Sequence, residues 1–78
     1  MSRGYRENLP ITYLIVELLR RRDVVKDQEL YSALKSLVPE ISLLEFNKAL
    51  MVLELRGLIE VDTIKKDTKV IKLLKRER

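Results

Sequence analysis

Positions 42–62, "SLLEFNKALMVLELRGLIEVD", fix both ends of a helix and the start of a strand. Ser42 and Glu45 form an S-x-x-E capping box, which satisfies backbone N–H groups at a helix N-terminus. Gly57 suits the left-handed conformation at which many helices end. Apolar and polar residues then alternate, as in a half-buried strand. We therefore expect a helix over 43–56 that leads directly into a strand.

Two earlier helices are expected from the same kind of signal. The first spans 10–22, with Asn8 as a possible cap and Pro10 in its first turn, where a missing N–H has no cost. Its apolar stripe consists of Ile11, Leu14, Ile15, Leu18 and Leu19. The second spans 27–37 and begins at Asp27, a good N-cap residue. Its apolar face consists of Leu30, Leu34, Leu37 and Val38.

Short strands complete the chain. Val24-Val25 is too short for a helix and suits one edge of a small sheet. "LIEVDTI" and "KVIKLLK" are joined by "KKDT", which predicts a hairpin with about six residues in each arm. The order is helix, short strand, helix, turn, helix and hairpin, so the expected fold class is α+β.

The length of 78 residues allows one hydrophobic core and therefore one domain. We expect a flexible N-terminal arm over 1–9, a folded domain over 10–75 and a basic C-terminal tail over 76–78. No apolar run reaches the roughly 20 residues that a membrane span requires, and no signal peptide is evident, so a cytoplasmic protein is expected. Abundant charged residues and few Asn, Gln and Cys are typical of thermophile proteins.

Catalysis has little support in this composition. The chain contains no Cys and no His, which removes thiol nucleophiles, imidazole bases and most zinc sites. Its helical carboxylates are explained by capping or ion pairing: Glu17, Glu29, Glu45 and Glu54. We expect no enzyme activity, no catalytic residue, no metal and no cofactor.

Positive charge is concentrated at the C-terminal end. Positions 65–78 hold seven Lys or Arg against two Asp or Glu, 7 − 2 = +5. The other residues hold nine against ten, 9 − 10 = −1, so the net charge of +4 comes entirely from this end. A polyanion is expected to contact the chain here.

The order of elements, together with "FNKALMVLELRGLIEVD", resembles the winged helix-turn-helix domains, especially those of small archaeal DNA-binding proteins and transcription regulators. The phrase that carries the resemblance is Ala49-Leu50, then Leu53-Glu54, then "RGLI". "KDQELYSAL" is similar to the second helix of these domains. The resemblance covers about positions 10–75, and it implies three helices, a short first strand and a C-terminal hairpin, called the wing.

In that family the third helix enters the major groove, and the wing lies on the phosphate backbone or in the adjacent minor groove. By position, the resemblance places Asn47 and Lys48 near base edges. It assigns phosphate contact to the wing lysines Lys65, Lys66, Lys69 and Lys72. Lysines offer phosphates a point charge without base-specific geometry, so they add affinity and little sequence preference. An alternative is that these lysines protect the hairpin from edge-to-edge pairing.

The arm offers two further candidate contacts. Arg3 and Arg6 could reach a minor groove, or the arm could be disordered. Double-stranded DNA is therefore the partner that the resemblance implies.

The 43–56 helix is apolar on more than one side. A helical projection at 100° per residue gathers its core face from Phe46, Leu50, Leu53, Ala49 and Leu43. Opposite lie Leu44, Lys48, Met51 and Leu55, with Asn47 and Val52 at the flanks. Few of these side chains could hydrogen-bond to bases. Leu55 could pack under the wing and Val52 against the first helix, but Leu44 and Met51 would stay exposed.

Two functions follow. The first is double-stranded DNA binding by a transcription regulator or chromatin-associated factor through a basic wing. The alternative is a protein-interaction or dimerisation module, with Leu44, Met51 and Leu55 as the interface of a homodimer or a complex with another protein.

Overall fold

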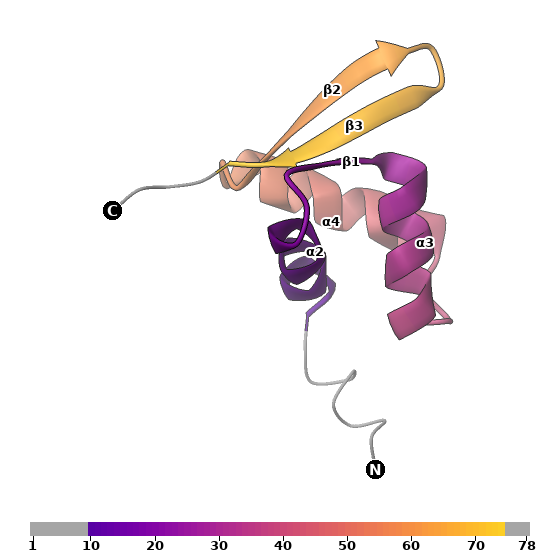
Figure 1. Cartoon of the computed structure of the whole chain (residues 1–78). Coiled ribbons are helices and arrows are strands. Elements are labelled where there is room, and N and C mark those ends of the chain that lie inside the picture. Colours follow the sequence, from indigo (N-terminus) through magenta and orange to yellow (C-terminus); the bar gives the residue numbers. More distant parts are fainter. Residues whose placement is uncertain (1–9, 75–78) are drawn as a thin grey trace.

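The computed structural model describes residues 10–74, which form helices and one antiparallel sheet (Figure 1). The elements are α2 (Ile11–Arg20), β1 (Val24–Lys26), α3 (Asp27–Leu37), α4 (Leu43–Leu55), β2 (Ile59–Lys65) and β3 (Thr68–Leu73). The expected α+β class and element order are confirmed within this range. The arm over 1–9 and the tail over 76–78 lie outside the described residues.

The three strands pair in the order β1-β3-β2. β1 is an edge strand, as expected, with Val25 opposite Ile71 of β3. β2 and β3 form the hairpin, in which Val61 lies opposite the same Ile71. Only Lys66 and Asp67 separate the two arms, and the pairing shifts between Thr63 and Lys65. Such a bulge increases the local twist of a hairpin.

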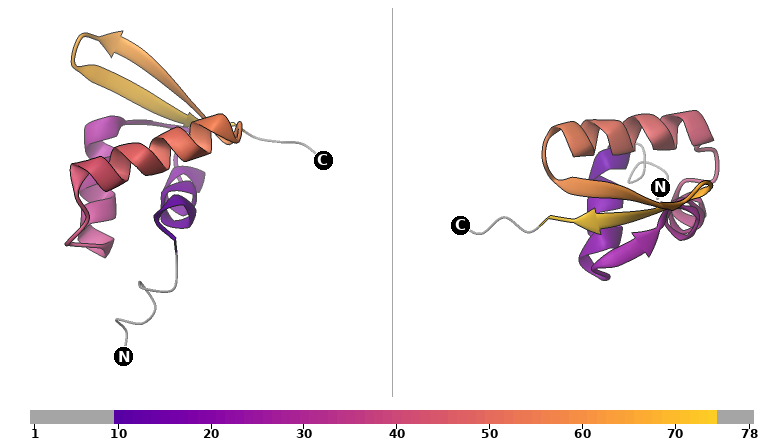
Figure 2. Two further views of the ribbon diagram at one scale, coloured as in Figure 1. Left: turned by 180° about the vertical axis from the view of Figure 1, so that it is seen from behind. Right: turned by 90° about the horizontal axis from the view of Figure 1, so that it is seen from above.

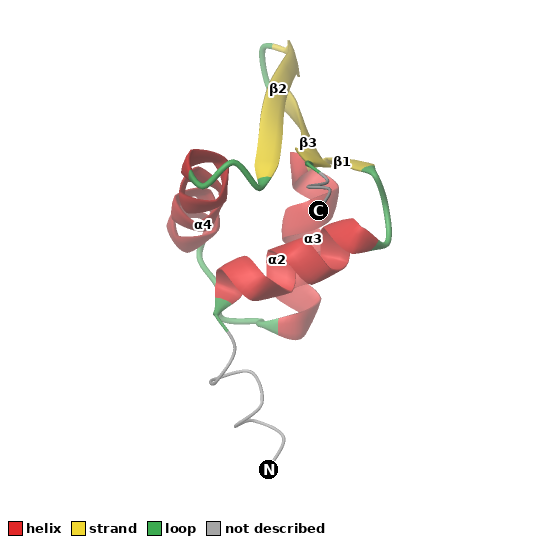
Figure 3. Ribbon diagram, turned by 90° about the vertical axis from the view of Figure 1, so that its left-hand side faces the viewer, coloured by secondary structure: helices red, strands yellow, loops and turns green. Residues whose placement is uncertain are grey.

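The core lies between one face of the sheet and the three described helices, and the hairpin extends beyond it (Figure 3). The buried side chains are all apolar: Leu14, Ile15, Leu19, Val25, Leu30, Leu34, Ile41, Phe46, Ala49, Leu50, Leu53, Ile59 and Ile71. Every helix and every strand of the described residues contributes at least one of them. The core therefore holds the base of the hairpin against α4.

Both ends of α4 form as the sequence predicts. The Glu45 backbone N–H donates to Ser42 Oγ at 3.1 Å, and the Ser42 N–H donates to Glu45 Oε1 at 3.0 Å, which completes the capping box. At the other end Gly57 has φ 77°. The Gly57 N–H donates to the Glu54 carbonyl and the Leu58 N–H to the Leu53 carbonyl, each at 3.0 Å. These two bonds form a Schellman motif, which turns the chain directly into β2.

The N-cap residues of the other two helices, and the end of α2, differ from expectation. α2 begins at Ile11 and ends at Arg20, two residues earlier than predicted, because the chain must extend to form β1. Its N-cap residue is Pro10, whose ψ of 150° is extended; Asn8 lies outside the described residues. α3 has the predicted bounds, but its N-cap residue is Lys26 and Asp27 is its first helical residue.

Two predicted core positions are wrong. Leu43 is 56% exposed because it is the first residue of α4, one turn before Phe46, and precedes the part of the helix that is buried. Leu37 is 38% exposed in the last turn of α3, beside a surface pocket that it lines with residues of α2. Periodicity placed both residues on an apolar face, but an apolar face is buried only where another element covers it.

Candidate functional site

The end of the hairpin, residues 63–69, is an exposed surface with more basic than acidic residues. Every one of these residues except Thr68 is exposed. Lys65, Lys66 and Lys69 oppose a single acid, Asp67, 3 − 1 = +2. The strands that carry them project past the helices (Figure 1). A large anion can therefore approach this end without meeting the rest of the molecule.

The sheet separates two of the predicted contact residues. Side chains alternate between faces along a strand, so Lys69 shares the face of Ile71, which is buried against the helices. Lys72 points to the opposite face, where it lies across from Glu60 of β2 and Val24 of β1. A ligand on the α4 side of the sheet would meet Lys69 and not Lys72. The four predicted lysines are thus not one cluster.

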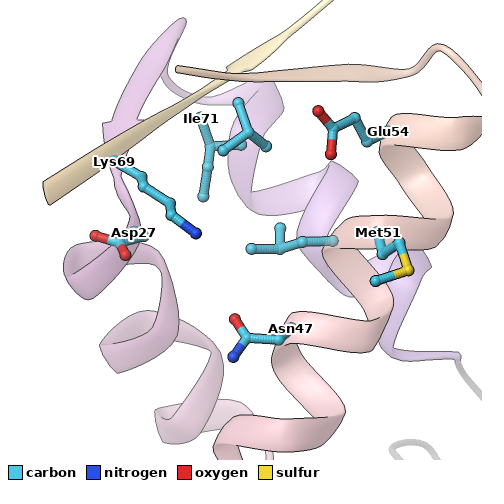
Figure 4. A pocket seen from close by; sticks show the side chains of 8 residues that line it. Asp27, Asn47, Met51, Glu54, Lys69 and Ile71 are labelled. Atoms are coloured by element: carbon cyan, nitrogen blue, oxygen red, sulfur yellow. The ribbon is translucent and has the colours of Figure 1, made fainter. Parts of the chain in front are cut away.

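A pocket separates α4 from the hairpin, with a cavity volume of about 220 Å³ (Figure 4). Its lining comes from α3, α4 and the hairpin: Asp27, Asn47, Leu50, Met51, Glu54, Val61, Lys69 and Ile71. Figure 4 shows the Lys69 side chain extending between Asp27 and Asn47. The structure therefore brings together Asn47 and Lys69, which lie 22 residues apart in the sequence (69 − 47).

The charge inside this pocket does not favour a phosphate. Asp27 and Glu54 line it together with one cation, Lys69, 1 − 2 = −1. Asp27 Oδ1 is buried and makes no hydrogen bond to a described residue. A phosphate placed deep in the pocket would meet two carboxylates, so the favourable place for an anion is the exposed hairpin end.

The outer face of α4 is mostly apolar and exposed, and one of its residues, Met51, also borders the pocket beside the hairpin. We define this face by Leu44, Lys48, Met51 and Leu55. The three apolar members are 66%, 59% and 81% exposed, respectively, and Lys48 is exposed as well. α4 runs along one side of the molecule next to β2 (Figure 2), and no described element lies beyond it (Figure 3). Packing of Leu55 under the hairpin is therefore wrong.

The physical reason lies in the helical repeat. β2 contacts the flank of α4 that carries Leu50 and Glu54, which line the pocket with Val61. Leu55 lies about 140° around the helix axis from Leu50, so it points away from the hairpin. Val52 is 39% exposed, which leaves it partly covered.

Arg20 at the end of α2, with Arg21 and Arg22 directly after it, forms another basic group. Arg20 Nε lies 3.3 Å from Glu17 Oε2, and Arg22 Nη1 lies 3.9 Å from Glu29 Oε1. Both pairs are more than 40% exposed, so their energy is small, yet they lower the local positive potential. The hairpin end has no such ion pair among the described residues.

Other predicted site residues are placed as follows. Asn47 lies on the pocket side of α4, whereas Lys48 lies on its outer face. Arg3 and Arg6 lie outside the described residues. The sequence did not indicate that Asp27 and Glu54 line this pocket. The alternation of side chains along β3 is enough to place Lys69 on the α4 side of the sheet. Asp27 joins the pocket only because α3 packs against the hairpin.

Within residues 10–74, no group of three or more acidic, His or Cys side chains could hold a metal ion. No described helix combines the length and apolar character needed to cross a membrane. Comparisons with protein-family models, curated proteins and solved structures found no match for this chain.

Proposed function

We propose that this chain is a cytoplasmic double-stranded DNA-binding protein of the winged helix-turn-helix class, acting as a transcription regulator or chromatin-associated factor. The element order, the β1-β3-β2 sheet and the short connection from α3 to α4 support the class. In this assignment α4 is the recognition helix and the β2–β3 hairpin is the wing.

The observation that carries the proposal is the exposed basic end of the hairpin. Lys65, Lys66 and Lys69 extend past the core on a two-stranded ribbon, where they can follow a phosphate backbone. Each neutralised phosphate releases condensed counterions and so adds affinity that does not depend on sequence. The wing is therefore the main contact, with Asn47 beside it on α4.

Sequence reading by α4 is expected to be weak. Its exposed side presents leucine and methionine where hydrogen-bonding groups would be needed to distinguish base pairs. Over its full length α4 has one Lys and two Glu, 1 − 2 = −1, which does not attract the duplex. The protein should bind different duplexes with similar affinity.

A salt-dependent titration tests this function. Random and genomic duplexes are titrated with the full chain while the salt concentration is varied. If about three to five phosphates are neutralised, log K falls against log salt with a slope of roughly −3 to −4.5. A slope near zero, or no binding at low salt, contradicts DNA binding. Strong preference for one duplex contradicts the assignment of contact mainly to the wing.

A protein-interaction module is the second candidate, and it is favoured by the outer face of α4. Leu44, Met51 and Leu55 form contiguous apolar exposure on a small protein, which commonly marks an interface. The wing and this face are different surfaces, but α4 is also the recognition helix of the first proposal and Met51 lines the pocket beside Lys69, so a protein partner on this face would compete with DNA for α4.

A further inference from the structure

Asp27 at the start of α3 and Lys69 of β3 face each other where the helix meets the sheet. β1 pairs with β3 in a regular antiparallel register, in which Val25 lies opposite Ile71. Continued by two residues, this register brings Asp27 opposite Lys69, although the chain enters α3 at this point. Val25 and Ile71 are buried on the helix side of the sheet, and Lys69 shares that side by alternation. Both charged side chains line the pocket between α4 and the hairpin.

The Asp27 carboxylate has one oxygen without a donor. Its Oδ1 atom is buried and makes no hydrogen bond to a described residue. A buried acceptor without a donor costs free energy, and a carboxylate is stabilised most by a charged donor. Among the side chains that line the pocket, Lys69 carries the only positive charge, and Asn47 is the only other N–H donor. The Lys69 side chain extends into the space between Asp27 and Asn47 (Figure 4), so its ammonium is the favoured donor.

The other acid of the pocket, Glu54, is a weaker partner for this lysine. Glu54 is exposed on α4, whereas Asp27 is half-buried at the start of α3. Water screens the charge of an exposed carboxylate, so a half-buried carboxylate attracts a cation more strongly. Asp27 therefore combines the open acceptor with the stronger attraction.

We propose that Asp27 is a positioning residue for the wing, because its carboxylate holds the Lys69 ammonium in an ion pair when DNA is absent. The inference rests on the proposed function and adds a competition for one of the wing lysines. The flexible stem of Lys69 lets its ammonium either meet Asp27 or turn outward to a phosphate. A phosphate beside Asp27 would meet a second negative charge at close range, so the two uses of Lys69 exclude each other.

The three lysines at the hairpin end therefore differ in what DNA binding costs them. Lys65 and Lys66 are exposed and do not line the pocket with Asp27, so their ammonium groups are available to a duplex. Lys69 must first leave Asp27. The competition lowers the affinity for DNA without lowering the number of phosphates that the wing can contact.

The first test compares two acids in the first turn of α3. Asp27→Asn and Glu29→Gln remove the same charge from the same end of one helix, so they change the net charge and the helix-dipole interaction alike. Only Asp27 lines the pocket with Lys69, whereas Glu29 lies 3.9 Å from Arg22 in an exposed pair. Asp27→Asn should strengthen duplex binding about two- to fivefold, the range of a partly exposed ion pair. Glu29→Gln should change it less. Equal gains, measured by fluorescence anisotropy with labelled duplexes, would overturn the proposal.

The second test asks whether Asp27 acts through Lys69. In a Lys69→Gln protein, Asp27→Asn should no longer strengthen duplex binding, because the carboxylate has no ammonium to hold. An effect of Asp27 on the helix or on the general potential would persist in this background. An equal gain with Lys69 and with Gln at position 69 would therefore overturn the proposal. Circular dichroism of each variant confirms that the helices remain formed.

The third test measures the same four proteins by urea denaturation without DNA. Asp27→Asn should raise the unfolding equilibrium constant about two- to fivefold more when Lys69 is present than in the Lys69→Gln background. Additive effects would overturn the ion pair and leave DNA binding by the wing intact. If no variant binds duplexes at low salt, the proposed function fails together with the competition, even where the coupling between Asp27 and Lys69 is found.

Discussion

The two faces of α4 are similar in composition but differ in their surroundings. The inner face carries Phe46 and Leu53, which are 2% and 1% exposed. The outer face carries Leu44 and Leu55, which are 66% and 81% exposed. An apolar side chain gains free energy when it is buried, but it is buried only if a neighbouring helix or strand packs against it. In α4 such neighbours cover the inner face and not the outer one.

A second contrast separates the outer face from the end of the hairpin. Both surfaces are exposed, but one is apolar and the other carries a net charge of +2 from three lysines and one aspartate. Apolar surface gains free energy by excluding water, whereas the lysines gain it from phosphates at low salt. The molecule therefore carries two exposed surfaces that differ in chemical character, and the two proposed functions assign them to different partners.

The largest expected effect distinguishes the two faces of α4 by stability. Phe46→Ala should lower the free energy of unfolding by about 3–5 kcal/mol, because it leaves a cavity and removes the ring contact with Tyr31 at a centroid distance of 5.1 Å. Met51→Ala on the outer face should change it by less than about 0.5 kcal/mol. Urea denaturation measures both, and equal losses would show that the outer face is also packed in solution.

The next effect concerns the hairpin end. Replacing Lys65, Lys66 and Lys69 with alanine should weaken duplex binding roughly 500-fold at 0.1 M salt, because three phosphate contacts are lost. The loss should be similar for every sequence. Fluorescence anisotropy with labelled duplexes measures it.

A charge-matched control uses three lysines away from this end. Lys26 and Lys72 lie on the opposite face of the sheet, and Lys35 lies on α3. Replacing these three with alanine lowers the net charge equally but should weaken binding far less. Equal losses would mean that net charge, and not the hairpin end, governs binding.

A smaller effect is expected where α4 turns into the hairpin. Gly57→Ala should cost about 1–2 kcal/mol, because an alanine at φ 77° is strained. An added Cβ would meet no atom within 4 Å, so the cost comes from the backbone alone. Thermal unfolding followed by circular dichroism measures it. No loss of stability would mean that the turn adopts another conformation in solution.

The smallest effect is expected at the N-terminus of α4. Ser42→Ala removes the acceptor of the Glu45 N–H and should cost about 1 kcal/mol. Ser42→Asp keeps an acceptor at this position and should retain most of the stability. Denaturation midpoints compare the two variants. If both are destabilised equally, the capping hydrogen bond does not account for the loss.

The sequence determined the local features of this protein. The capping box, Gly57, the hairpin and the basic end depend on residues within a few positions of one another, so their patterns can be read directly. The exposure of Leu44 and Met51 also followed from the helical repeat, because a helix this apolar cannot bury every side at once.

The tertiary structure decided what long-range packing controls. The packing of α3 against β3 brought Asp27 beside Lys69, whereas the alternation of side chains along β3 was enough to place Lys69 and Lys72 on opposite faces. Tertiary packing also left Leu43 in solvent, although its periodicity matches that of Phe46. Local chemistry sets which segments form helices and strands, but the contact between distant segments sets which side chains are covered and which charges meet.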